Sequence, residues 1–476
     1  MIGGSPLRYD LTAEPWIPVL TDTGMNQRSL TTIFDDDVLA IVTGDPLEDA
    51  AILRLLLAIR IAAGPGAPQS WVREHAERFD LFSETQPFGQ NPDMARLVAV
   101  DRATRPLAAQ SYTLAGNGST AVNRFHTLSG ITFSPAAAAR LLLMRQAFSV
   151  GGIQQFPAAA YGKAPISAKT AVCTNRAFVW IDTGRLSSTL QVNADLAASY
   201  PRGTFHFGWP DPSTPPPIAG NPGGVLDALT WPSRSVYLLP ADPVEQIMIC
   251  DGVRWPEAAT GYGPERDAEF FAHAVFERKT KKAPLTIQGV HTERVPWRQL
   301  LTGLAAEQPA GSVLAVAQSN PASLPPGSMV RIAGLGSYQA RIDGPVTGAF
   351  PVPAAGVEVG GLVALLNEAF TSHGSYFGSL IHAAGLSDRQ QSAAAAGRLS
   401  QYVALPSQLE PVATAVARAE LTLEQARELV TVIVAAANRR ALDQFRLVHV
   451  DAAGRVDARK SSMSLAGSAT GRKDAK

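Results

Sequence analysis

The chain has 476 residues, of which 46% are hydrophobic and 17% are charged. This is a globular composition in a chain too long for one core, so we expect two or three folding units. The 41 basic and 41 acidic residues cancel at pH 7, which excludes a chain that binds nucleic acid through its overall charge. Any such contact needs local basic patches or partner proteins.

Cysteine usage and the N-terminus indicate the compartment. Cys173 and Cys250 are too few for a disulfide framework and form no Cys-x-x-Cys zinc motif. The N-terminus lacks the basic and apolar regions of a secretory signal, and the leucine-rich run at Ile52 to Ala63 is shorter than the roughly 20 residues that span a bilayer. We therefore expect a cytoplasmic protein without a membrane segment.

The first elements are a strand and a helix. A short strand is predicted at Trp16 to Leu20, and Pro15 and Pro18 favour a sheet edge because proline donates no hydrogen bond to a central ladder. An amphipathic helix is predicted at about Leu47 to Ala63. Asp45-Pro46 is a typical helix start, and leucines then recur on one face. Both elements are expected in the core.

The middle of the chain alternates short strand-like runs with turns rich in glycine and proline, which indicates a mixed α/β region. Pro210 to Pro217 and Gly220 to Gly224 are predicted to form a long exposed loop, because such sequences hold no regular structure. The predicted strands are Phe178 to Ile181, Val236 to Leu239 and Ile247 to Ile249.

The last part of the chain is helical in pattern. Apolar residues recur at helical spacing from about Val357 to Arg446, and Thr422-Leu-Glu-Gln425 has the form of a capping box. We expect an α+β protein, with a large mixed α/β N-terminal domain over residues 1–355 and a C-terminal helical bundle over residues 356–450. Residues 451–476 are predicted to be a flexible tail, because they contain few large apolar side chains.

Catalytic motifs are not recognisable in the sequence. It contains no His-Glu-x-x-His, His-Asp or Gly-x-Ser-x-Gly motif. Asp35 to Asp37 indicate a solvated turn, because three consecutive carboxylates point in different directions. Gly467 to Asp474 is too short in spacing for a phosphate loop. We therefore expect no enzyme activity, no cofactor and no metal.

Four segments in the first ninety residues, taken in order, resemble the start of a known family: Glu14 to Val19, Leu53 to Ile59, Phe79 to Phe82 and Pro87 to Gln90. The family is CasA, the large subunit of the type I-E CRISPR surveillance complex Cascade. The resemblance covers most of residues 9–350 and is weaker through the helical region, where the family has a four-helix bundle. It implies a role in antiviral defence directed by a guide RNA.

The resemblance implies a DNA wedge at Gln339. Gly334 to Gln339 is predicted as a turn after the extended segment Met329 to Ala333, and on sequence alone it would be an ordinary β-turn. In the family, a glutamine after such glycines inserts into the duplex beside the protospacer-adjacent motif (PAM). Gln339 matches it, and Tyr338 occupies the preceding wedge position.

A second implied contact is a glycine loop. Gly151 and Gly152 follow a predicted helix at about Pro135 to Ala147 and match a family loop that presents backbone atoms to the minor groove at the PAM. The family carries three glycines there and this chain has two. Without the resemblance, a glycine stop at the end of a helix is an equally good interpretation.

Two further regions are assigned less directly. Asn123, Arg124 and Phe125 lie where the family has a loop that contacts the guide-RNA end of the complex. The family also places a basic finger in the minor groove, on a stretch that cannot be aligned residue by residue. An ordinary solvated surface would explain both regions as well. The finger candidates are Arg254, Lys279, Lys281 and Lys282.

The resemblance therefore implies a non-catalytic DNA-recognition subunit that reads the PAM, wedges the duplex open to start R-loop formation, and docks a helicase-nuclease. The implied partners are the other Cascade subunits, the CRISPR guide RNA, double-stranded target DNA and the helicase-nuclease recruited after R-loop formation. Two alternatives remain open. One is a small-molecule hydrolase or transferase with an unrecognised site, and the other is a purely structural scaffold subunit.

Overall fold

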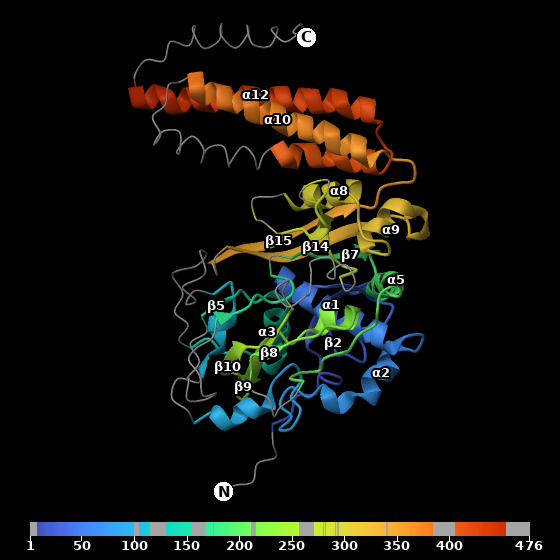
Figure 1. The fold of residues 1–476 in the computed structure, drawn as a ribbon, viewed down its shortest axis with the longest axis vertical. Helices are drawn as coiled ribbons and strands as arrows, with labels where there is room; N and C mark the ends of the chain where they lie inside the picture. Colours follow the sequence, from blue (N-terminus) through green and yellow to red (C-terminus); the bar gives the residue numbers. More distant parts are fainter. Residues whose placement is uncertain are drawn as a thin grey trace. The chain divides into compact units, whose positions relative to one another are not determined.

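The structure is a computed structural model that combines helices and sheets in two compact units, Met1–Val352 and Pro353–Lys476 (Figure 1). The predicted α+β class, with a mixed first part and a helical last part, is confirmed. The predicted border was at residues 355 and 356. The residues that the structure describes are 7–99, 104–114, 130–153, 167–174, 176–210, 216–256, 271–278, 280, 282–290, 292, 295–338, 341–383 and 405–453.

The first sheet has three antiparallel strands: β1 (Ile17–Thr21), β2 (Gly24–Arg28) and β3 (Val38–Ile41). Its order is β2-β1-β3, so β1 is the central strand and the predicted edge position is wrong. Pro18 is tolerated because the pairing of β1 with β3 begins only at Val19, so that no β3 residue needs a proline N–H.

The predicted helix is observed as α1 (Pro46–Ala63). The Asp45 carboxylate caps it, accepting from the Leu47 N–H at 2.8 Å. The expected single apolar face is wrong, because every residue from Ala50 to Ile59 is buried. Helices surround α1: α2 (Pro68–Glu74), α3 (Pro135–Phe148), α5 (Leu186–Ala197) and α6 (Val225–Thr230).

None of the described helices is by itself both long and apolar enough to cross a bilayer. Only α1 and α2 taken together pass by length and composition, and these two helices are bent by 89°.

The sheet that carries the wedge candidate is formed by β7 (Phe178–Asp182), β14 (Met329–Tyr338) and β15 (Arg341–Pro351), in the order β15-β14-β7. Helix α8 (Pro296–Ala305) packs on β15, and α9 (Val313–Ser319) packs on α8. Figure 1 shows β14 and β15 as one long hairpin.

The remaining predicted strands are also present, as β9 (Arg234–Leu238) and β10 (Gln246–Asp251). Strand β10 is central in this sheet and pairs with β9 on one side and with β4 (Arg105–Pro106) on the other. Part of the predicted long loop is ordered into a strand, because Ile218–Ala219 (β8) pairs in parallel with Val253–Arg254 (β11). The short elements are β5 (Gly152–Ile153), β6 (Ser167–Ala168), β12 (Phe276–Glu277), β13 (Thr286–Ile287), η1 (Ala76–Arg78), η2 (Pro92–Leu97), η3 (Leu107–Gln110) and η5 (Pro321–Ser323).

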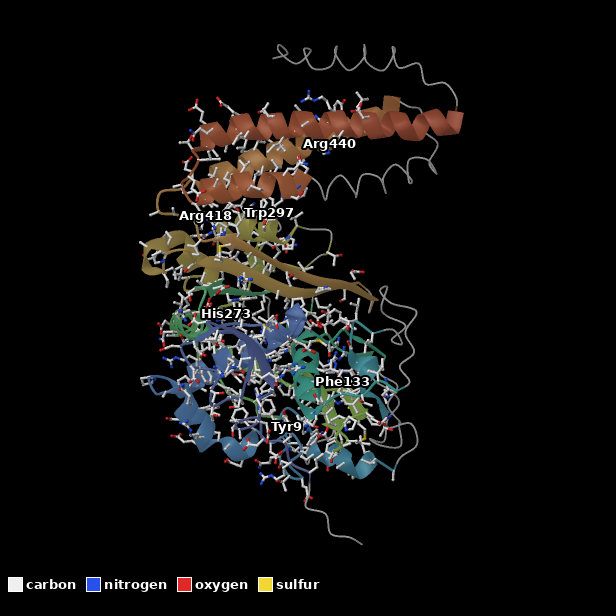
Figure 2. All side chains as sticks on the ribbon, turned by 180° about the vertical axis from the view of Figure 1, so that it is seen from behind. Tyr9, Phe133, His273, Trp297, Arg418 and Arg440 are labelled. Atoms are coloured by element: carbon white, nitrogen blue, oxygen red, sulfur yellow. The ribbon has the colours of Figure 1, made fainter. Side chains whose placement is uncertain are left out.

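One large hydrophobic cluster forms the core of the first unit, and the recognised N-terminal segments belong to it. Trp16, Phe79, Phe148 and Phe178 are almost fully buried. His273, labelled in Figure 2, is buried in the same unit, and its ring lies against Phe178. The N-terminal landmarks are therefore structural residues.

The second unit is helical: α10 (Val359–Ala383), a helix over residues 405–417, and α12 (Leu423–Ala453). The predicted capping box is confirmed, because the Gln425 N–H donates to Thr422 Oγ1 at 3.2 Å and the Thr422 N–H donates to Gln425 Oε1 at 2.9 Å. Helix α12 includes residues 451–453 of the segment predicted as a tail, and residues 454–476 lie outside the described residues.

Candidate nucleic-acid interface

The glycine loop, defined here as residues 149–153, follows α3. A Cβ atom at Gly151 would lie 2.9 Å from the Ala168 carbonyl oxygen, and Gly152 has φ +136°, so both positions require glycine. Helix α3 has already ended at Phe148, and its C-cap Ser149 is extended. The two glycines are therefore not a helix stop. They bring the chain close to β6, with which β5 pairs.

A buried arginine holds this loop from its inner side. Arg234 is 1% exposed and donates from Nη2 to the Val150 carbonyl at 2.9 Å and to the Ser149 carbonyl at 3.5 Å. Its Nη1 donates to the Ser233 carbonyl at 2.7 Å. Burial lowers the pKa of Arg234 to about 10, whereas the nearby Asp251 carboxylate acts in the opposite direction.

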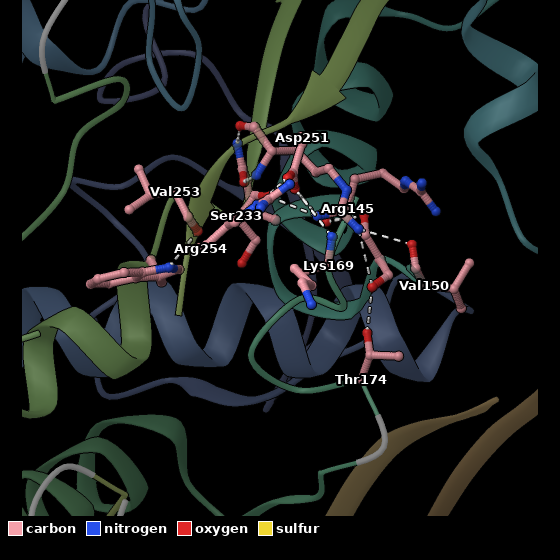
Figure 3. Close-up of polar contacts among 12 residues, drawn as sticks. Arg145, Val150, Lys169, Thr174, Ser233, Asp251, Val253 and Arg254 are labelled. Atoms are coloured by element: carbon pink, nitrogen blue, oxygen red, sulfur yellow. Dashed lines mark hydrogen bonds and ion pairs between the residues drawn. The ribbon is translucent and has the colours of Figure 1, made fainter. Parts of the chain in front are cut away.

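Asp251 links Arg234 to a finger candidate. Its Oδ1 lies 3.9 Å from Arg234 Nη1 and accepts the Lys169 N–H at 3.2 Å. Its Oδ2 accepts from Arg254 Nε at 2.7 Å. Both residues are labelled in Figure 3. Because Lys169 and Gly151 are close neighbours, one buried carboxylate joins Arg254 to the flank of the glycine loop.

A second buried guanidinium lies close to Arg234. Arg145, on α3, is 4% exposed. Burial, together with the positive charge of Arg234, lowers the pKa of Arg145 to about 9. The inner side of the loop therefore holds more buried positive than negative charge, which favours an anion at the surface above it.

The hairpin that carries the wedge candidate differs from its prediction. Gly334 to Tyr338 continue β14, so the predicted turn at Gly334 is wrong. The glycines serve close packing: a Cβ at Gly334 would lie 2.9 Å from Val290 Cγ2, and one at Gly336 would lie 3.1 Å from Thr292 Cγ2. Tyr338 ends β14 and pairs with Arg341. Gln339 lies outside the described residues.

Thr174 connects the glycine loop to this hairpin. Its Oγ1 donates to the Ser149 carbonyl at 2.8 Å, and its backbone forms a parallel bridge with Leu335 on β14. Tyr338 is three residues beyond Leu335, about 10 Å along an extended strand. The structure thus brings the glycine loop and the end of β14 into one region, although nearly 190 residues separate them in sequence.

Of the other candidates, only Lys282 lies within the described residues. Asn123, Arg124, Phe125, Lys279 and Lys281 lie outside the described residues. Lys282 is exposed between β12 and β13, and the neighbouring Arg278 pairs with Glu307 at 2.8 Å. Within the described ranges, no hydrogen bond or ion pair connects Lys282 to the glycine loop.

Sequence reasoning missed Thr174, Arg234 and Asp251. No sequence pattern distinguishes a buried arginine such as Arg234 from an exposed one. The contacts of these three residues with the glycine loop and its flank join positions 25 to 85 apart, so only the folded chain reveals them.

Within the described residues, no group of three or more His, Cys, Asp or Glu side chains lies together to hold a metal. His206 Nε2 and Asp227 Oδ1 are 2.8 Å apart, but Asp227 also accepts the N–H groups of Thr204 and Gly223. His206 borders a cavity of about 50 Å³, which has room for only a few water molecules. This pair organises a loop.

Fold and site define a class of protein: a two-unit α+β chain whose first unit joins a glycine loop to a long β-hairpin. The profile of the CRISPR-associated protein Cse1 family matches residues 10–404, and the chain belongs to this family. The CasA resemblance seen in the sequence is thereby confirmed. A search of curated proteins finds no match.

Solved structures have the same fold. Cse1 of Thermobifida fusca is 21% identical, with a TM-score of 0.73 over 96% of each chain. CasA of Thermus thermophilus is 22% identical, with a TM-score of 0.67 over 92% of this chain and 94% of that chain. A chain of a CRISPR RNA-guided surveillance complex is 16% identical, with a TM-score of 0.65 over 93% of this chain and 99% of that chain.

Proposed function

We propose that the chain is the non-catalytic DNA-recognition subunit of a surveillance complex directed by a guide RNA. It contacts the PAM in the minor groove, opens the adjacent duplex to start R-loop formation, and offers a docking surface to a helicase-nuclease. Its partners are the other Cascade subunits, the guide RNA and double-stranded DNA. Family membership supports this proposal, as does the fold shared with a chain of an RNA-guided surveillance complex.

The observation that carries the proposal is the connection through Thr174 between the glycine loop and β14. A subunit that both reads and opens a duplex needs its reading and wedging groups within a few base-pair steps, and the distance of about 10 Å from Leu335 to Tyr338 corresponds to about three steps of B-DNA. Backbone atoms at Gly151 and Gly152 carry no side chain that would block a narrow groove. Minor-groove edges distinguish base pairs poorly, so we expect several PAM sequences to be accepted.

The wedge has a physical basis. Unstacking one base step costs a few kcal/mol, and a side chain that fills the gap offsets part of this cost. Pairing of the target strand with the guide RNA is then a near-balanced exchange that extends from the opened end. Sequence specificity beyond the PAM therefore belongs to the RNA.

Gln339→Ala in the assembled complex tests the wedge. We expect strand opening next to the PAM to slow by about tenfold or more, because the alanine no longer offsets the unstacking cost. Fluorescence of 2-aminopurine placed beside the PAM reports opening. Gln27→Ala, at an exposed glutamine on β2, is the matched control and should open DNA at the wild-type rate.

Other outcomes separate the alternatives. An unchanged opening rate in Gln339→Ala would remove the wedge assignment. Purification of the chain without RNA, after coexpression with the other complex subunits, would contradict the subunit role. A pH-dependent hydrolytic activity of the chain alone would favour the enzyme alternative, and a complex that opens DNA equally well without this chain would favour the scaffold.

A further inference from the structure

Arg234 has a geometry that none of the family-based assignments uses. We propose that Arg234 is the positioning residue of the glycine loop, and that it turns the N–H groups of Val150 and Gly151 away from the guanidinium, as donors for DNA. This inference rests on the proposed function, because it needs the loop to contact DNA.

The orientation follows from peptide geometry. The C=O and N–H of a trans peptide point in opposite directions. Arg234 Nη2 binds the carbonyls of both Ser149 and Val150, at 3.5 and 2.9 Å. The N–H groups of the same two peptides, those of Val150 and Gly151, therefore both point away from Arg234. Successive N–H groups on one side of a loop form an acceptor-binding concavity suited to phosphate or base-edge oxygens.

The guanidinium is suited to this task. Its planar fork donates to the Val150 and Ser233 carbonyls at the same time, and Asp251 lies 3.9 Å away. A hydrogen bond from a cation to a carbonyl also polarises that peptide, which strengthens its N–H as a donor. A lysine ammonium has no planar fork and reproduces this arrangement poorly.

Other hydrogen bonds also hold the loop, so replacing Arg234 should affect only one of its peptides. The Ser149 carbonyl also accepts from Thr174 Oγ1 and from the Ala171 N–H, both at 2.8 Å. Replacing Arg234 therefore leaves Ser149 attached and frees chiefly the peptide between Val150 and Gly151. We expect the loop to remain in place but to lose its orientation.

Arg234→Lys in the assembled complex tests the proposal, with Arg54→Lys as the matched control. Arg54 is likewise buried and donates to two successive carbonyls, those of Ala228 and Leu229, at 2.6 and 3.2 Å. The measurement is equilibrium binding of a duplex with the PAM and of the same duplex with a scrambled PAM. Thermal unfolding of each variant reports its stability.

We expect both variants to unfold at lower temperature, because each loses buried hydrogen bonds. Only Arg234→Lys should lose preference for the PAM duplex, by about tenfold, the effect of removing one good base contact. Arg234→Gln serves if the lysine variant does not assemble, because it buries no lone ammonium, and its expected result is the same.

A wild-type preference retained in a folded Arg234 variant would overturn the positioning role and leave the proposed function intact. An equal loss of preference in Arg54→Lys would also overturn it, because the loss would then reflect stability alone. A wild-type complex that binds both duplexes equally would instead overturn the proposed function, and the inference with it.

Discussion

Buried polar side chains hold the ends of helices in the first unit. Arg54 donates to the Ala228 and Leu229 carbonyls near the end of α6, and Arg234 donates to those of Ser149 and Val150 just beyond α3. Carbonyls at helix ends have no partner within the helix, and the negative end of the helix dipole favours a cation there. Each arginine thus supplies hydrogen bonds to carbonyl groups at or beyond a helix end.

His273 should make the stability of the first unit depend on pH. Burial lowers its pKa to about 4, and the charge of Arg54 acts in the same direction. Its Nδ1–H donates to the Val179 carbonyl at 3.1 Å, which raises the pKa and so opposes the effect of burial without overcoming it. Because the unfolded chain binds this proton from about pH 6.5 downward, stability is full above that pH and falls as the pH drops toward 4.

The loss should amount to about 3 kcal/mol at pH 4. His273→Phe removes the titrating group and should flatten this part of the pH dependence. Urea unfolding of both full-length chains between pH 7 and pH 4 measures it, since the difference between the two isolates His273. Parallel pH profiles for the two chains would contradict the prediction.

Helix ends in this protein follow local sequence signals. Asp45 caps α1, Ser134 caps α3 and the Thr422–Gln425 pair caps α12, each through hydrogen bonds to N–H groups that lack helical partners. These signals act within a few residues, so they are independent of how the helix packs. The extent of burial around each helix is not local, as the fully surrounded α1 shows.

Thr422→Ala should destabilise the helical unit by about 1 kcal/mol, because the Gln425 N–H loses its acceptor. Thr431→Ala is the matched control, at an exposed threonine inside the same helix whose Oγ1 donates to the Arg427 carbonyl. Alanine is the better helix former there, so this change should be neutral or slightly stabilising. Far-ultraviolet circular dichroism during thermal unfolding of the full chain compares them. Equal effects at both positions would contradict the capping role.

The whole chain carries no net charge, with 41 basic and 41 acidic residues. Many of the described arginines are already engaged with carboxylates or carbonyls, including Arg254 with Asp251 and Arg278 with Glu307. We therefore expect weak long-range attraction to DNA, and under the proposed function the other subunits of the complex bring this chain to its target.

The isolated chain should accordingly show a shallow salt dependence of DNA binding. We expect a slope of log K against log salt no steeper than about −3, which corresponds to about three neutralised phosphates or fewer. Fluorescence anisotropy of a labelled duplex over a range of salt concentrations measures it. A slope twice as steep would indicate an extended basic surface and contradict the inference from neutrality.

Much of the architecture followed from local sequence. The α+β class, the helix starts and the strands predicted at Phe178 to Ile181 and Ile247 to Ile249 are present, because periodicity, caps and turn residues act over short distances. The family followed from the resemblance of the N-terminal segments. The central position of β1 and the strand conformation of Gly334 to Tyr338 were not predicted. Proline and glycine restrict or permit backbone conformations, but the neighbouring strands decide which one is used.

The features of the candidate site also divide into those that the sequence indicates and those that only the folded chain shows. By itself, the sequence singled out Gly151 and Gly152 through their resemblance to a family loop. The structure adds that only glycine meets the conformational demands of these two positions. The tertiary structure alone decided that Arg234 and Asp251 support this loop and that Thr174 ties it to β14. The physical reason is that a residue pattern encodes local backbone conformation, whereas the burial and the partner of a polar side chain are decided by packing between segments distant in the chain.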